Sequence, residues 1–150
     1  AAKALALGSI RLRRRRSKSI LDTPNVLRAP TRPYRIGHPY WRRGSGLVEL
    51  PIQVTRGPRL PYIGTTLTLA GPDRARWLTK LVLGEPLVNL ELHGIDVLDV
   101  DDGLEPLRRH QPDIRISKER KLETLTAVVE QLRGAGYTFV TLSEATEHFS

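Results

Sequence analysis

The residue of this chain best suited to proton transfer stands at the end of an alternating segment. In residues 87–96, apolar side chains occupy positions 88, 90 and 92, and His93 follows them directly. This period of two predicts a β-strand with one buried face, and a strand end holds a side chain rigidly where solvent can reach it. Because histidine exchanges protons near neutral pH, His93 is a candidate acid or base. The alternative is a rim histidine hydrogen-bonded to a neighbouring carbonyl.

Acidic residues follow the histidine. Asp96 lies three residues further on, close enough to orient the imidazole across a turn, and it opens an acidic stretch that runs to position 105. Carboxylates of this kind suit calcium, but with Gly103 at the sixth place of a calcium loop, Leu98 and Val100 would occupy ligand positions. The chain also has no cysteine and no His-x-x-x-His pair, so the sequence predicts no metal site within it.

Alternating strands and helices are expected to position these residues. The hydrophobic patterns predict strands at 47–54, 86–93 and 137–142, helices from 72 to about 83 and from a Ser117 cap to about 134, and a short last helix from 143. The apolar faces of the two long helices are expected to consist of Ala75, Leu78, Leu81, Val82, Leu122, Leu125, Val128, Val129 and Leu132. This order favours parallel strands joined by crossover helices, and therefore an α/β fold.

The first part of the chain is strongly basic. Residues 1–60 carry 14 Lys and Arg against two acids, whereas residues 61–150 carry 10 against 14. The arginine run at 11–18 could bind phosphates or an anionic surface, but no nucleic-acid-binding motif accompanies it. A solvated segment is the alternative, and no specific nucleic-acid partner is expected. Charge and proline density predict that residues 1–46 form a basic, Pro/Arg-rich irregular segment, which is either part of the same domain as residues 47–150 or an insertion.

No apolar run approaches the roughly 20 residues that a membrane-spanning helix needs. The apolar stretch at 4–10 is too short for a span, and its positive charges follow it, which is unlike a signal peptide. The sequence therefore predicts no transmembrane segment and favours a cytoplasmic protein.

Four segments, taken in order, resemble the C-terminal part of a polysaccharide deacetylase. They are Gly-Leu-Val-Glu-Leu-Pro at 46–51, Arg-Leu-Pro-Tyr-Ile-Gly at 59–64, Leu-Glu-Leu-His-Gly-Ile-Asp at 90–96 and Gly-Tyr-Thr-Phe-Val-Thr-Leu at 136–142. The family is the NodB-homology group, carbohydrate esterase family 4. The resemblance implies a TIM-like, distorted (β/α) barrel, of which residues 47–150 would be the C-terminal portion. It also implies a hydrolase of carbon–nitrogen bonds that removes acetyl groups from an acetylated glycan or glycolipid.

The same resemblance assigns roles to two residues, and a third is predicted to bind substrate beside them. Residues 90–93 match the family's Leu-x-His motif, which implies that His93 is the general acid that protonates the leaving group. Leu92 would line the pocket for the acetyl methyl group, and Asp96 is the other predicted substrate-binding residue. The family's Asp-Asp and His-x-x-x-His motifs have no match in place. Zinc is therefore expected in an intact family member, and no metal is expected to be bound by this chain.

Two functions stay open on the sequence. The chain could contribute the general acid of an intact parent deacetylase, or it could be an inactive half-length homologue that binds a glycan or a protein. A partial barrel leaves an unpaired sheet edge and an uncovered apolar face. The sequence thus predicts that the isolated chain is poorly folded, or that it associates with itself or with the missing half of the barrel.

Overall fold

The computed structural model describes Asn25 and residues 28–150. The predictions for residues 1–24, including the arginine run at 11–18, lie outside these described residues.

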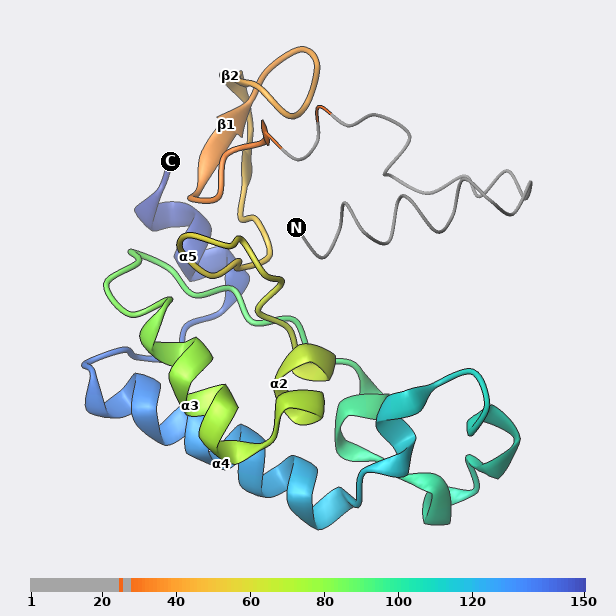
Figure 1. The fold of residues 1–150 in the computed structure, drawn as a ribbon. Coiled ribbons are helices and arrows are strands. Elements are labelled where there is room, and N and C mark those ends of the chain that lie inside the picture. The colour runs from red at the N-terminus through yellow and green to blue at the C-terminus, as the bar shows by residue number, and fades with distance from the viewer. Residues whose placement is uncertain (1–24, 26–27) are drawn as a thin grey trace.

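Helices form the body of the molecule (Figure 1). The helices are α2 (Gly64–Ala70), α3 (Pro72–Lys80), α4 (Lys118–Gly134) and α5 (Leu142–His148). The first three pack against one another around a core of Tyr62, Leu67, Ala75, Leu78, Val82, Val128 and Leu132. None of the described helices is long and apolar enough to cross a bilayer.

The two long helices are confirmed, with start signals that the sequence carries. Pro72 occupies the first turn of α3, where its missing N–H costs nothing, and the hydroxyl of Ser117 caps α4 by accepting the Arg120 N–H. Helix α3 is shorter than predicted because it ends at Lys80, and residues 81–84 form a turn instead.

Helix α4 buries a face that differs in part from the predicted one. Three of its predicted apolar residues are buried, namely Leu125, Val128 and Leu132. Leu122 is exposed, however, and Lys121 takes its place in the interior.

A β-hairpin occupies part of the stretch that proline density predicts to be irregular. Strands β1 (Tyr34–Ile36) and β2 (Arg43–Glu49) pair antiparallel, with a register shift between Arg35 and Ile36 that leaves residues 44–47 of β2 bulged. The prediction is wrong here because Pro33 and Pro39 flank β1 rather than interrupt it, so the ladder keeps its N–H donors. Strand β2 also crosses the boundary predicted between residues 46 and 47.

The other predicted strands do not form ladders among the described residues. Residues 50–54 contribute one antiparallel bridge, Val54 to Pro61, and residues 86–93 contribute one parallel bridge, Ile63 to Glu91. Residues 137–141 pair with no strand, and Leu142 starts α5. Alternation predicts an extended backbone, which these segments have, but a ladder also needs a partner strand along its length. The partial (β/α) barrel stays a prediction.

Short turns of 3-10 helix replace the predicted acidic loop. They are η2 (Gly94–Val97), η3 (Val100–Asp102), η4 (Glu105–Leu107) and η5 (Pro112–Arg115). Turns η2 and η5 contact each other and α2, and η2 also contacts α4. The residues that follow His93 are therefore anchored to the helical body.

Candidate functional site

Two backbone hydrogen bonds hold the extended segment that leads to His93. The Gln53 N–H donates to the Asn89 carbonyl, and the Gly64 N–H donates to the Glu91 carbonyl, both at 2.9 Å. His93 is itself extended, with φ −112° and ψ 159°, and η2 begins at the next residue. The predicted strand thus ends at a fixed turn, although it belongs to no sheet.

Asp96 is fully buried and fastens this turn to α2. Its Oδ2 accepts the backbone N–H of His93 at 2.8 Å, and its Oδ1 accepts the hydroxyl of Thr65 at 2.8 Å. A Cβ on Gly64 would overlap the Asp96 carboxylate and lie 2.8 Å from Leu92 Cδ2. Glycine therefore allows the first residue of α2 to sit against the carboxylate, and the carboxylate positions the backbone of His93.

The imidazole of His93 lies between two carboxylates and is 55% exposed. Its Nδ1 is 3.7 Å from Asp96 Oδ2, and its Nε2 is 3.6 Å from Glu91 Oε1. Both separations exceed ordinary hydrogen-bonding distance, so the ring nitrogens stay accessible to a bound molecule. The arrangement can hold a proton and deliver it, while the role of His93 as general acid stays a prediction.

Lys121 supports the same turn from the side of α4. Its side chain is fully buried, and Nζ donates to the carbonyls of Ile95 at 2.8 Å and Leu98 at 2.5 Å. A lysine is usually solvent-exposed, and sequence reasoning missed this contact. The signal that could have found it is spacing, since Lys121 lies four residues before Leu125 on the buried face of α4.

The acidic stretch after Asp96 caps turns rather than gathering into a cation site. Asp99 is buried and accepts the N–H groups of Asp101 at 2.9 Å and Lys118 at 2.6 Å. The ammonium of Lys118 lies 2.5 Å from Asp102 Oδ1. The hydrogen bond from Lys118, with that from the Asp99 N–H, lowers the pKa of the Asp102 carboxyl, and the Asp102 carboxylate raises the pKa of Lys118. These carboxylates thus fix the N-terminus of α4 against η3.

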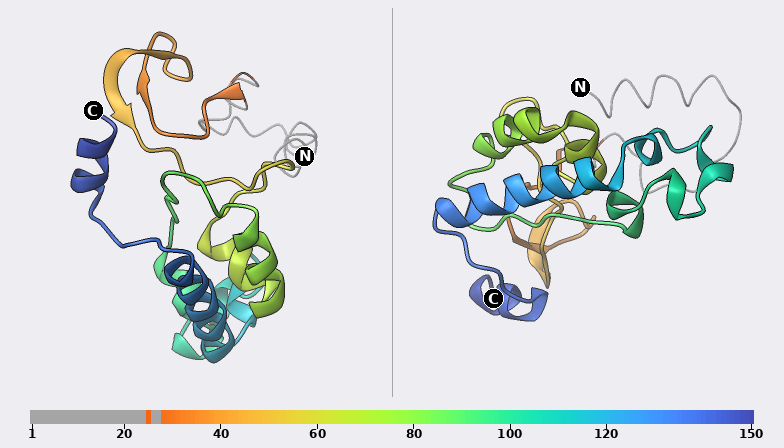
Figure 2. Two further views of the ribbon diagram at one scale, coloured as in Figure 1. Left: turned by 90° about the vertical axis from the view of Figure 1, so that its left-hand side faces the viewer. Right: turned by 90° about the horizontal axis from the view of Figure 1, so that it is seen from below.

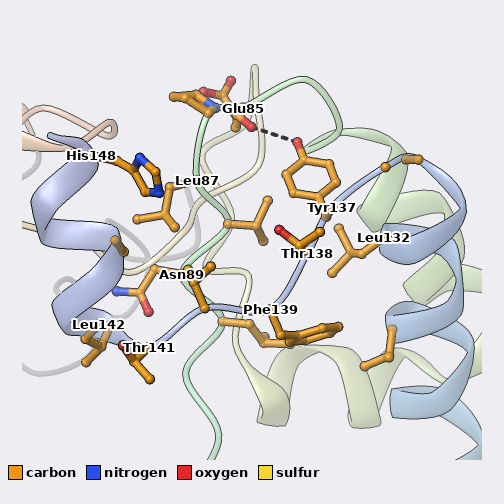
Figure 3. Close-up of a pocket in the computed structure, with 18 of the residues that line it drawn as sticks. Glu85, Leu87, Asn89, Leu132, Tyr137, Thr138, Phe139, Thr141, Leu142 and His148 are labelled. Atoms are coloured by element: carbon orange, nitrogen blue, oxygen red, sulfur yellow. Dashed lines mark hydrogen bonds between the residues drawn. The ribbon is translucent and has the colours of Figure 1, made fainter.

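A hollow of about 970 Å³ lies beside the turn, between residues 84–92 and residues 135–149 (Figure 3). Leu92, which is 51% exposed, lines it, but His93 does not. Most of the lining is apolar, with Asn89, Thr138 and His148 among its polar members. The predicted acetyl-binding residue therefore borders a cavity that the imidazole does not line, and the acetyl pocket itself stays a prediction.

Tyr137 closes one end of the hollow. Its hydroxyl donates to the Glu85 carbonyl at 2.8 Å and accepts the Gly84 N–H at 2.9 Å (Figure 3). Between Tyr137 and α5, the two segments that line the hollow are not hydrogen-bonded to each other in the part of the chain that the structure describes. Within the described chain, no backbone hydrogen bond joins residues 138–140, or Val88 and Leu90, to any partner. Both segments are predicted from the sequence to be strands, but the structure shows that they do not pair with each other.

The described residues do not fit the zinc ion that the resemblance implies. No group of three or more His, Asp or Glu side chains in residues 28–150 is arranged to hold a metal. At His93, one of the two nearby carboxylates, Asp96, already accepts hydrogen bonds from Thr65 and from the backbone. This turn can therefore supply a proton donor but not a metal centre.

Comparison with known proteins finds no family model that matches the chain, no curated protein that is similar in sequence and no solved structure that is similar in fold.

Proposed function

We propose that this chain is the C-terminal part of a polysaccharide deacetylase-like hydrolase, in which His93 is the general acid. One observation supports this role above the others. The imidazole stands half-exposed at a turn that Asp96 and Lys121 anchor from inside the protein. A proton donor must be both fixed in place and open to substrate, and His93 meets both conditions.

The step assigned to His93 is protonation of the leaving nitrogen. In removal of an N-acetyl group, water adds to the carbonyl carbon, the carbon–nitrogen bond breaks, and the amine takes up a proton. The imidazolium of His93 gives that proton and becomes neutral, ready to be protonated again from solvent. The described residues supply this acid but not the group that activates the water.

The hollow favours a second function, in which the protein binds without catalysis. Its lining includes Leu92, yet the imidazole of His93 lies outside it, and the described residues offer no metal-holding group. A mostly apolar cavity with a few polar side chains is typical of a binding site. The chain would then act as a glycan- or protein-binding homologue of the enzyme.

The test is release of acetate from an acetylated oligosaccharide by the protein purified from its own cell, with its intact mass recorded. We expect the native protein to release acetate in the presence of zinc. His93→Ala should lower kcat by about 100-fold or more, because positioned acid catalysis contributes roughly 10²–10⁴-fold.

His110→Ala is the matched control, since it removes an exposed histidine from another turn and should leave the rate unchanged. Full activity of His93→Ala would refute the role of His93. An absence of acetate release by the native protein would refute the enzyme and favour the binding function.

A further inference from the structure

The hairpin of β1 and β2 carries positive charge that the described chain does not neutralise. Residues 28–60 contain seven arginines and a single acid, Glu49, whereas residues 61–150 are net negative. Among the residues that the structure describes, Arg32 alone of the seven forms an ion pair, with Glu85 at 2.7 Å. The charges of the other six are not paired with an acid among the described residues, so they can attract an anion.

Three of these arginines lie on the hairpin itself, and all three are exposed. Arg42 extends from the loop before β2, Arg43 lies 5.9 Å from the ring centroid of Tyr34, and Arg35 Nη1 donates to the Gly46 carbonyl at 3.2 Å. A guanidinium has five N–H donors, so these contacts leave donors available on each side chain.

The hairpin also presents an aromatic ring among the arginines. Tyr40 is 45% exposed, and Trp41 lies edge-on against it with ring centroids 5.0 Å apart. The hydroxyl of Tyr34 donates to the Tyr40 carbonyl at 3.0 Å and so fixes the loop. A Cβ on Gly44 would overlap the backbone of Gly37, which shows that the two sides of the hairpin are in close backbone contact.

We propose that this arginine surface, formed by Arg35, Arg42, Arg43 and the ring of Tyr40, binds an acidic saccharide. The choice of a saccharide rests on the proposed function. Guanidinium groups bind carboxylates through paired, charge-assisted hydrogen bonds, and an aromatic face offers apolar contact to a sugar ring. The hairpin projects from the helical body (Figures 1 and 2), and none of these four residues belongs to the hollow or to the turn at His93. It is a second binding surface.

The hairpin suits a charged sugar better than a nucleic acid. Single-stranded nucleic acids are bound by several aromatic side chains that stack on successive bases. In the described hairpin, Tyr40 is the exposed large aromatic residue, and half-buried Trp41 is turned edge-on to it. One ring flanked by arginines matches one charged sugar unit rather than a row of bases.

The experiment is calorimetric titration of the full chain with a short oligogalacturonate and with its methyl ester, which has the same sugar but no charge. It uses a background in which the arginines at 13–16 are glutamine, so that this run does not supply the binding. We expect Arg42→Gln/Arg43→Gln to weaken binding of the oligogalacturonate at least about tenfold, from the loss of charged hydrogen bonds. The charge-matched control, Arg74→Gln/Arg109→Gln, changes exposed arginines outside the hairpin and should change affinity less than about twofold.

The single variant Arg42→Gln tests whether misfolding explains the loss of affinity. The Arg42 side chain makes no hydrogen bond or ion pair within the described residues, so this variant should fold normally and still bind the oligogalacturonate more weakly. Equal affinity for the methyl ester, or an equal loss in the control variant, would overturn the proposal. Tighter binding of a short oligothymidylate than of the oligogalacturonate would also overturn it, in favour of a nucleic-acid partner. This titration measures binding and not acetate release. A negative result would therefore refute the saccharide surface without bearing on the role of His93, which the acetate assay tests.

Discussion

At the scale of single residues, Gly64 and Asp96 determine how the histidine turn, formed by His93 and η2, packs against α2. The carboxylate of Asp96 occupies the space that a side chain at Gly64 would need, and it bonds at once to Thr65 and to the backbone of His93. A buried carboxylate is tolerated only when its oxygens are hydrogen-bonded. Moving it would therefore release the turn that presents the imidazole.

Gly64→Ala should destabilise the protein by roughly 1–2 kcal/mol. Alanine gains up to about 1 kcal/mol of helix propensity at a glycine position, but overpacking against fixed neighbours costs about 1–3 kcal/mol. Urea unfolding measures the change in the free energy of unfolding. The matched control is Gly134→Ala in the last turn of α4, where a Cβ meets nothing within 4 Å, and it should be neutral or stabilising. Equal behaviour of the two variants would contradict the close contact at Asp96.

At the scale of elements, local signals explain which helices were predicted and which was missed. Helices α3 and α4 combine apolar spacing with a proline or serine at the start, whereas α2 has the sequence Gly-Thr-Thr-Leu-Thr-Leu-Ala. Glycine and threonine have low helix propensity. Helix α2 forms because it buries Leu67 completely in the core, and that burial depends on α3 and α4.

The N-terminus of α4 should lose stability in acid through the Lys118–Asp102 pair. The pKa of Asp102 is lowered in the folded state, so the pair stabilises the protein above the unfolded carboxyl pKa of 3.8. The contribution disappears as the pH falls through the lower folded value. Asp102→Asn should therefore be less stable than the wild type at neutral pH, and the difference should vanish well below pH 3.8.

Urea unfolding at the two pH values measures this difference. Asp101→Asn is the control, because the Asp101 side chain is exposed and forms no ion pair among the described residues. If Asp102→Asn and Asp101→Asn differed from the wild type equally at neutral pH, the ion pair would carry no stability.

At the scale of the whole molecule, the extended segments leave large apolar side chains uncovered. Leu47, Ile52, Leu92, Phe139, Val140 and Leu142 are all exposed, and each lies in a stretch that the sequence predicts as a strand. Exposed apolar side chains and unpaired backbone edges favour association with another chain. Self-association, or pairing with a missing half, stays a prediction of the sequence.

Phe139→Asp/Leu142→Asp should shift the chain from an associated state to a monomer in sedimentation velocity, because a charge at these exposed positions opposes burial in an interface. Trp77→Asp is the control, since Trp77 on α3 is also more than half exposed and the change should leave association intact. A wild-type chain that stays monomeric over the concentration range, with a sharp thermal transition, would contradict the prediction.

The sequence by itself determined the features that depend on neighbouring residues. Helices α3 and α4 follow from spacing and caps, and the closeness of His93 to Asp96 follows from a separation of three residues. Only the tertiary structure decided the rest, because it depends on residues far apart in the chain. The sequence could not show that Thr65 and Lys121 hold the histidine turn, or that Leu92 and Phe139 border an open hollow rather than a sheet. Alternation specifies an extended backbone, but a strand becomes part of a sheet only when a distant segment supplies its hydrogen bonds.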